Sequence, residues 1–359
     1  MKRLMSAVCA VLALCLGLAA CNTGSSSGGG SSAPISSRAP AIAYTETIRV
    51  YNASEYIDQT TLADFEREFA IKVEYEEFES NEAMYSEIIA SPNSYDVLVP
   101  SDYLADRLIK EGRLAPLDKS KLSTLGNIAG EYLSPSYDPG NSYTVPYMVG
   151  TLGLLYNKRQ VADEIKSWEA LFDSRYSGKV LMLNSQRDTI GLTLKMLGYS
   201  MNSGSDTELE QAKARLQAAR VIVAAYNESE EIRDKLVAGE GTLGVVYSGD
   251  AKTAIDRNPN LAYIIPEEGS NKWVDSFVIM KDSQHIDAAH KFIEFMCRSN
   301  IAVRNMSDIG YTSPVQGAWS EFNSNKIMFP SAEELERCEA FLYDENAAGK
   351  YSAVWGSVR

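Results

Sequence analysis

Short strand-like segments alternate with helix-like segments along most of the chain, and this alternation constrains the fold more than any other feature. Ile48 and Val50 share one face of the first strand, and Asp58 is placed to cap a following helix on which Phe65 and Phe69 recur at helical spacing. Further strands are expected at 72–75, 97–99, 152–156, 180–183, 221–225 and 243–247, and further helices at 81–89, 102–110, 189–197, 207–220 and 230–238. Repeated strand–helix–strand units predict an α/β fold with largely parallel sheets covered by helices on both faces.

The first twenty residues have the pattern of a secretory signal. Lys2 and Arg3 precede an almost wholly apolar run, 4–18, which is too short to span a bilayer comfortably. The run ends in Leu-Ala-Ala-Cys, with Cys21 as its last residue. This ending resembles a bacterial lipobox, which implies cleavage before Cys21 and a lipid on its sulfur; an ordinary signal peptide with a chance cysteine is the alternative.

The segment that follows Cys21 is rich in Ser, Gly, Thr, Ala and Pro, and no core can be built from it. We therefore expect residues 21–46 to form a lipidated flexible tether, which would hold a folded body at the periplasmic side of a bacterial membrane. Which of two membranes would carry the lipid is left open.

The balance of charge limits the class of partner. The chain has 48 acidic and 34 basic residues, a formal net charge of −14, which becomes −16 without residues 1–20. Nucleic acids and anionic membrane faces require basic patches, so neither is expected as the main partner. A negative field suits a cationic ligand, although it also simply keeps a protein soluble.

Two patterns that could indicate catalysis or a metal have simpler explanations. Residues 239–244 read GxGxxG, but a helix precedes the glycines and a strand follows them, the reverse of the order in dinucleotide sites, so Gly239 is expected to end a helix. His285 and His290 are five residues apart, which does not place both rings on one helical face. We expect no metal, no cofactor and no enzymatic activity.

Two cysteines, Cys297 and Cys338, remain beyond the signal and tether. Both stand in segments that read as helical, so we expect each to be a small buried apolar residue. A single disulfide in an oxidising compartment is the alternative.

Aromatic residues stand beside carboxylates in four short segments. These segments are Ser54-Glu55-Tyr56, Ser101-Asp102-Tyr103, Tyr247-Ser248-Gly249-Asp250 and Trp273-Val274-Asp275. The first three follow expected strands, and ligands of open α/β sheets bind at the carboxyl ends of strands. An aromatic face attracts a cation, and a carboxylate accepts charge-assisted hydrogen bonds from an ammonium group. Together the segments favour an organic cation with a short alkyl body.

At these residues the chain resembles the bacterial periplasmic spermidine/putrescine-binding proteins of polyamine ABC transporters, across nearly all of 48–358. The stretches that carry the resemblance are 50–57, 75–85 with its Glu79-Ser80-Asn81-Glu82, 96–101, 119–122, 145–147, 197–200, 273–276 and 309–311.

The resemblance implies a two-lobe periplasmic-binding-protein fold, similar to type II, with a ligand cleft between lobes joined by crossing strands. The implied lobes are 47–148 plus 274–318 and 149–273 plus 319–359. It implies hinge closure on a bound polyamine and delivery to the permease of an ABC importer.

Carried over position by position, the resemblance also implies a set of ligand-binding residues. Asp275 corresponds to the main acid for one terminal ammonium, beside Trp273 as an aromatic wall. Further walls or hydroxyl partners are Tyr103, Tyr247 and Tyr311, with Ser101 near Tyr103, while Ser54, Glu55 and Tyr56 would cap one end. Asp188 matches a family acid that is usually glutamate, and it could instead only cap a helix starting at Thr189.

Departures from the family pattern favour putrescine over spermidine. Ala53 stands where the family usually has tryptophan, and Ser185 stands where members that prefer spermidine have an acid. Asp250 resembles the acid of members that prefer putrescine. Two acids, Asp275 and Asp250, would then bind the two ammonium groups of a four-carbon diamine. Fewer acids would be left to bind the additional amine of an aminopropyl arm.

Other readings stay open from the sequence. A binding protein for an amino acid would need a basic partner for the carboxylate of its ligand, and these positions offer none. Thiamine and ferric iron are further candidate solutes. Ferric iron favours paired tyrosines, which Tyr247 and Tyr311 resemble only weakly. An enzyme on the same scaffold could offer only Asp188 with a neighbouring carboxylate. A polyamine sensor would share the site chemistry and differ only in its partner.

Overall fold

A computed structural model of the protein describes residues 42–359. The expected signal peptide, the lipidation site at Cys21 and nearly all of the expected tether lie outside the described residues. Within residues 42–359, no helix combines the length and the apolar character that crossing a membrane requires.

The described residues contain strands and helices in alternation. The strands are β1 (Glu46–Ala53), β2 (Ile71–Phe78), β3 (Val97–Leu98), β4 (Val145–Asn157), β5 (Val180–Leu183), β6 (Val223–Asn227), β7 (Leu243–Tyr247), β8 (Leu261–Ile264) and β9 (Lys272–Ile279). The helices are α1 (Gln59–Phe69), α2 (Asn81–Ala90), α3 (Asp102–Lys110), α4 (Gln186–Met196), α5 (Asp206–Ala218), α6 (Ser229–Ala238), α7 (Ser248–Arg257), α8 (Ile286–Met296), α9 (Ser299–Ile309), α10 (Ala332–Glu336) and α11 (Glu345–Val358).

Local signals in the sequence place most of these elements correctly. The bounds expected for β5, β7 and α3 are confirmed to the residue, and Asp58 caps α1 by accepting a hydrogen bond from the Thr60 amide. Gly239 ends α6 at a φ of 82°, a left-handed conformation that glycine adopts without strain. The GxGxxG stretch is therefore a helix end and a turn, as its order predicted.

The expectation of largely parallel sheets is wrong for the middle of the molecule. The strands form one nine-stranded sheet in the order β2-β1-β3-β9-β4-β7-β5-β6, with β8 also paired to β4. Its outer parts are parallel (β2, β1 and β3; β6, β5 and β7), whereas β9 and β4 pair antiparallel with each other and with their neighbours. The thirteen-residue β4 is much longer than the strand expected at 152–156. Its first half pairs with β9, and its second half pairs with β7 and β8.

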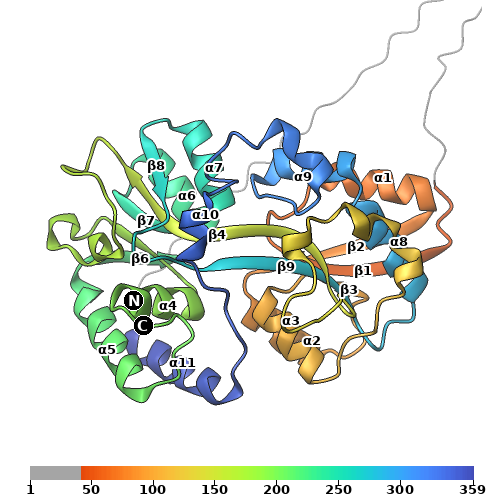
Figure 1. Ribbon diagram of the computed structural model, residues 1–359, viewed down its shortest axis with the longest axis horizontal. Coiled ribbons are helices and arrows are strands. Elements are labelled where there is room, and N and C mark those ends of the chain that lie inside the picture. Colours follow the sequence, from red (N-terminus) through yellow and green to blue (C-terminus); the bar gives the residue numbers. More distant parts are fainter. Residues whose placement is uncertain (1–41) are drawn as a thin grey trace, which may run out of the picture. The chain divides into compact units, whose positions relative to one another are not determined.

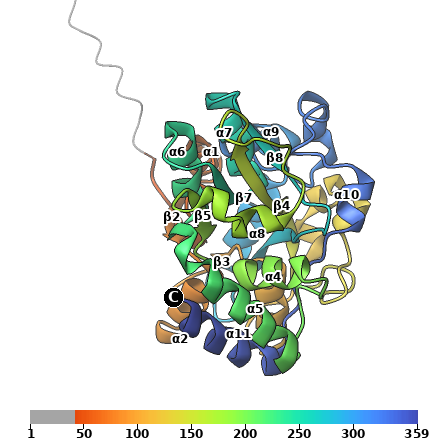
Figure 2. The ribbon, with the colours of Figure 1, turned by 90° about the vertical axis from the view of Figure 1, so that its left-hand side faces the viewer.

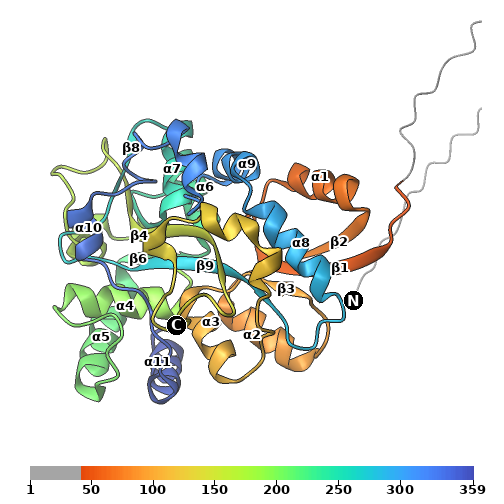
Figure 3. The same ribbon diagram turned by 45° about the vertical axis from the view of Figure 1, so that its right-hand side comes forward.

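The sheet carries two lobes, and β4 and β9 run between them (Figure 1). Buried side chains form one large cluster drawn mostly from 48–148 and 273–328, and another drawn from 152–261 and 347–358. Figure 3 shows α1 to α3 and α8 with β1 to β3 on one side, and α4, α5, α10 and α11 on the other. Met328 packs in the first cluster and Val354 in the second, so the chain passes between the lobes again after Met328. The lobe boundaries given above stay a prediction.

Helices cover both faces of the sheet in the second lobe. Helices α6 and α7 lie on one face, and α4, α5 and α11 lie on the other (Figure 2). This arrangement leaves the carboxyl ends of β5, β6 and β7 directed toward the first lobe, which positions the loops that follow them.

The two cysteines are free and buried, so the disulfide alternative is wrong. Cys297 ends α8 as expected, but Cys338 follows the short helix α10 rather than lying on a helix. His290 is buried; its Nδ1 pairs with the Ile286 carbonyl and its Nε2 accepts a hydrogen bond from the Asp118 amide. The ring therefore has a structural role.

Candidate functional site

A cavity of about 580 Å³ lies among the loops that follow β1, β2, β3, β5, β6 and β7, together with β9. That volume suits a small molecule. All eleven residues that the sequence singled out line this cavity: Ser54, Glu55, Tyr56, Ser101, Tyr103, Asp188, Tyr247, Asp250, Trp273, Asp275 and Tyr311. Segments far apart in the chain therefore converge in one place, although their roles toward a ligand stay predictions.

Asp275 enters the cavity from β9, the strand that runs between the lobes. Its Oδ2 accepts a hydrogen bond of 2.9 Å from the Tyr56 hydroxyl, whereas its Oδ1 is shielded from solvent and accepts none from the described residues. Burial raises the pKa of Asp275 to about 6; the hydroxyls of Ser101 and Tyr56 oppose this shift, and the negative charge of Asp188 adds to it. Because burial makes the ionised form of Asp275 costly, a cation bound beside this carboxylate would stabilise that form.

Asp188 is the second carboxylate of this kind. The Ser185 and Tyr247 hydroxyls donate to its Oδ2 at 2.6 and 2.9 Å, whereas its buried Oδ1 accepts no hydrogen bond from residues 42–359. Burial is the largest cause that raises the pKa of Asp188, and the charge of Glu82 contributes. The expectation that Asp188 might only cap a helix is wrong: α4 begins earlier, its cap is Ser185, and Asp188 stands in the first turn.

A continuous row of aromatic rings lines the wall between these acids. The Tyr247 and Trp273 ring centroids lie 6.1 Å apart, those of Trp273 and Tyr311 5.4 Å, and those of Tyr311 and Tyr56 5.2 Å. A Cβ on Gly249 would come within 2.4 Å of the Tyr311 ring, so only glycine allows that ring its position. The row offers apolar surface for an alkyl chain and ring faces for a cation.

Asp250 lines the cavity but is engaged by protein donors at both oxygens. Its Oδ2 accepts hydrogen bonds from the Ser229 hydroxyl at 2.6 Å and the Tyr311 hydroxyl at 3.0 Å. Its Oδ1 lies 3.0 Å from Nη1 of Arg233, a residue on α6. The sequence paired Asp250 with Asp275 as the two acids for a ligand; in the structure, Asp250 already has a cation beside it.

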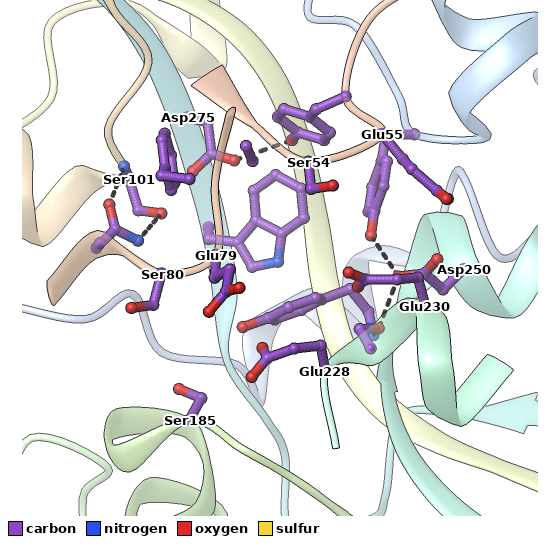
Figure 4. A pocket seen from close by; sticks show the side chains of 18 of the residues that line it. Ser54, Glu55, Glu79, Ser80, Ser101, Ser185, Glu228, Glu230, Asp250 and Asp275 are labelled. Atoms are coloured by element: carbon purple, nitrogen blue, oxygen red, sulfur yellow. Dashed lines mark hydrogen bonds between the residues drawn. The ribbon is translucent and has the colours of Figure 1, made fainter. Parts of the chain in front are cut away.

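Several cavity residues escaped the sequence reasoning. Figure 4 shows Glu79 and Glu228 beside the cavity, and Glu230 with Glu55 and Asp250 on the side away from Asp275. Glu228 follows β6 and Glu79 follows β2, so the rule that ligands bind after strand ends would have found both. Arg233 gave no such signal, because its helical segment reads as an ordinary charged surface.

The cavity is strongly acidic. Among the described lining residues, eleven are Asp or Glu, and Arg233 and Arg257 are the basic ones. No cluster of three or more His, Cys, Asp or Glu side chains in residues 42–359 has an arrangement that could hold a metal ion. Two buried carboxylate oxygens, an aromatic wall and a negative field can bind a slender organic dication, with charge-assisted hydrogen bonds at its ends.

Comparison with curated proteins identifies relatives along most of the chain. The spermidine/putrescine-binding periplasmic protein of Salmonella typhimurium is 33% identical over 316 residues, which cover 86% of this chain and 89% of that protein. The putrescine-binding periplasmic protein SpuD of Pseudomonas aeruginosa is 30% identical and covers 83% of this chain and 88% of its own length.

A solved structure and a family model agree with these relatives. A structure described as a putative spermidine/putrescine ABC transporter from Listeria monocytogenes superposes with a TM-score of 0.84 at 34% identity, covering 87% of this chain and 98% of that one. The model of the bacterial extracellular solute-binding proteins matches residues 60–330. The chain therefore belongs to the bacterial extracellular solute-binding proteins, the family that it shares with the spermidine/putrescine-binding periplasmic proteins.

Proposed function

We propose that this protein captures putrescine, and also spermidine, and delivers it to the membrane permease of an ABC importer. The observation that carries the proposal is a pair of buried carboxylates, Asp275 and Asp188, that line one cavity and each have one oxygen without a hydrogen bond from the described residues. Buried acceptors without donors are costly, and a ligand that donates at both positions removes that cost. The relatives named for these amines support the same ligand class.

In this proposal each carboxylate binds one terminal ammonium of a diamine. The methylene chain lies along Trp273, Tyr247 and Tyr311, whose rings are close together in one row. The charge of Asp188 raises the pKa of Asp275, so positive charge bound in the cavity favours the ionised form of both acids. No bond of the ligand is made or broken, as befits a family of solute-binding proteins.

Capture by closure of the two lobes follows from where these residues lie. Tyr56 belongs to the core of the first lobe, whereas Asp188 lies on α4 in the second. A ligand that contacts both sides favours the closed arrangement of the lobes, for which we propose the boundaries 47–148 plus 274–318 and 149–273 plus 319–359.

We also propose a location at the periplasmic side of a bacterial membrane, through a lipid on Cys21. The support is the sequence pattern of residues 1–21 and the periplasmic location in the names of the relatives. Mass analysis of the mature N-terminal peptide tests the anchor: a diacylated or triacylated Cys21 is expected, and an unmodified N-terminus at another residue would contradict it.

Calorimetric titration of the purified protein tests the function. Putrescine and spermidine should each bind at one site per chain, putrescine the more tightly, whereas glutamate, thiamine and ferric citrate should give no binding heat. Absence of binding by both amines, or binding of one of the other solutes instead, would refute the proposal. Clearly tighter binding of spermidine would overturn only the proposed preference for putrescine over spermidine.

The substitution Gly249→Ala should weaken putrescine binding about tenfold, because a displaced Tyr311 ring would lose contact with the ligand, and a loss of roughly 1.4 kcal/mol corresponds to a factor of ten. The added Cβ would force the Tyr311 ring away from the aromatic row. Gly349→Ala, on α11, is the matched control, since no atom beyond its chain neighbours and the adjacent backbone of α11 lies within 4 Å of its added Cβ, and it should leave the affinity unchanged. Unaltered putrescine affinity in Gly249→Ala, measured by the same titration, would show that the Tyr311 ring does not contact the ligand.

A further inference from the structure

The side chain of Arg233 is a fixed cation at one end of the cavity. Its Nη1 lies 3.0 Å from Asp250 Oδ1 and 3.1 Å from Glu55 Oε2, and its Nε lies 3.1 Å from Asp234 Oδ1. Only 12% of the Arg233 side chain is exposed. A guanidinium stays protonated at any physiological pH, so this charge cannot be removed by titration.

Arg233 joins groups that come from both lobes. Glu55 follows β1 in the first lobe and holds a φ of 51°, an uncommon conformation for a residue with a side chain. Asp250 stands in the first turn of α7, in the second lobe, and has 12% of its side chain exposed. The guanidinium therefore bridges the loop after β1 and α7 at this end of the cavity.

The carboxylates at the two ends of the cavity therefore differ in their hydrogen bonding and in whether a cation of the protein lies beside them. Asp275 and Asp188 each keep one buried oxygen that no donor among residues 42–359 reaches. Asp250 accepts hydrogen bonds from Ser229, Tyr311 and Arg233. The positive charge of Arg233 compensates the negative charge of Asp250, as a bound ammonium group would do. An ammonium placed at Asp250 would have to displace Arg233 or lie against it, and like charges at such distances repel strongly.

We propose that Arg233 is a specificity-determining residue that limits the ligand to two charged ends. It occupies the Asp250 and Glu55 carboxylates, so a third ammonium group at this end of the cavity would meet a fixed cation, and triamines are thereby disfavoured relative to diamines. This inference rests on the proposed function. It assigns the ammonium contacts to Asp275 and Asp188, and it makes Asp250 the residue that holds Arg233 and the Tyr311 hydroxyl in place.

Titration of putrescine and spermidine into Arg233→Met tests the inference, since methionine keeps much of the apolar stem and removes the charge. The spermidine-to-putrescine affinity ratio should rise at least about tenfold over the wild type, because an uncompensated Asp250 then accepts the third ammonium. The double variant R233M/D250N should lose this gain, and Arg233→Lys should keep a ratio near that of the wild type.

Lys252→Met is the matched control for charge. Lys252 lies on α7 two residues from Asp250 but pairs with Asp256 at 2.7 Å and is not among the cavity-lining residues. If Lys252→Met raises the ratio as much as Arg233→Met, the effect is a general one of charge and the inference fails. A ratio unchanged within about twofold in Arg233→Met would refute it as well.

A second variant keeps the inference testable if Arg233→Met does not fold. Asp250→Asn, with Arg233 retained, should lower putrescine affinity far less than removal of the Asp275 carboxylate does; an equal loss would overturn the assignment. These outcomes are separate from failure of the proposed function, which would show as no binding of either amine to the wild type.

Discussion

Replacing Asp275 by alanine should lower the affinity for putrescine by roughly two to three orders of magnitude. Truncating one partner of a buried, hydrogen-bonded charge pair costs roughly 2–5 kcal/mol, and 1.4 kcal/mol corresponds to a factor of ten. The loss arises because the ammonium would face a site from which the carboxylate has been removed, while the rest of the cavity still keeps it from water. Calorimetric titration measures the change directly.

Two controls separate this effect from general damage. Asp282→Ala removes one negative charge from an exposed residue just after β9 and should bind putrescine like the wild type. Thermal unfolding of ligand-free Asp275→Ala should show no loss of stability from the missing charge, because a carboxylate whose pKa is raised by burial costs the fold free energy at neutral pH. Wild-type affinity in Asp275→Ala would mean that the ammonium contacts lie elsewhere.

Putrescine affinity should fall as the pH is lowered through 6. The pKa of Asp275 is about 6 in the ligand-free protein, so its carboxylate is mostly ionised at pH 7 and mostly protonated at pH 5. A bound dication favours the ionised form, so protonation competes with binding and the affinity drops about tenfold for each pH unit below 6. The raised pKa of Asp188 acts in the same direction and steepens the fall. Putrescine itself keeps both charges, since alkyl ammonium groups titrate near pH 10.

The same titration in Asp275→Asn tells which group is responsible. Asparagine has nothing to titrate in this range, so the affinity should be lower overall and should change less between pH 7 and pH 5 than that of the wild type. A wild-type affinity that is independent of pH between 5 and 8, or an equally steep fall in Asp275→Asn, would contradict the role given to Asp275.

Much of the fold could be predicted because local signals decide it. The capping residue Asp58, the glycine at 239 and the apolar run of β7 each act over a few residues, and the corresponding elements lie where expected. The antiparallel centre of the sheet could not be predicted, because the pairing of β4 with β9 joins residues more than a hundred positions apart. The apolar character of 145–157 does not reveal its partner strand.

In the candidate site, too, the sequence predicts some features and not others. Aromatic and acidic residues after strand ends were sufficient to find Tyr56, Tyr103 and Asp250, since topology brings such loops together, whereas Tyr311 was found only through the resemblance to the family. The state of each carboxylate could not be read from the sequence. The sequence does not distinguish Asp250 from Asp188. In the structure, Arg233 on α6 pairs with Asp250, whereas Asp188 has a buried oxygen that accepts no hydrogen bond from the described part of the chain.

A crystal structure of the protein grown with putrescine tests the central claim most directly. The account predicts one diamine in the cavity, with one nitrogen about 3 Å from the Asp275 carboxylate and the other about 3 Å from the Asp188 carboxylate, and with Arg233 still paired to Asp250. A diamine whose nitrogen displaces Arg233 from Asp250, or one that lies outside this cavity altogether, would contradict it.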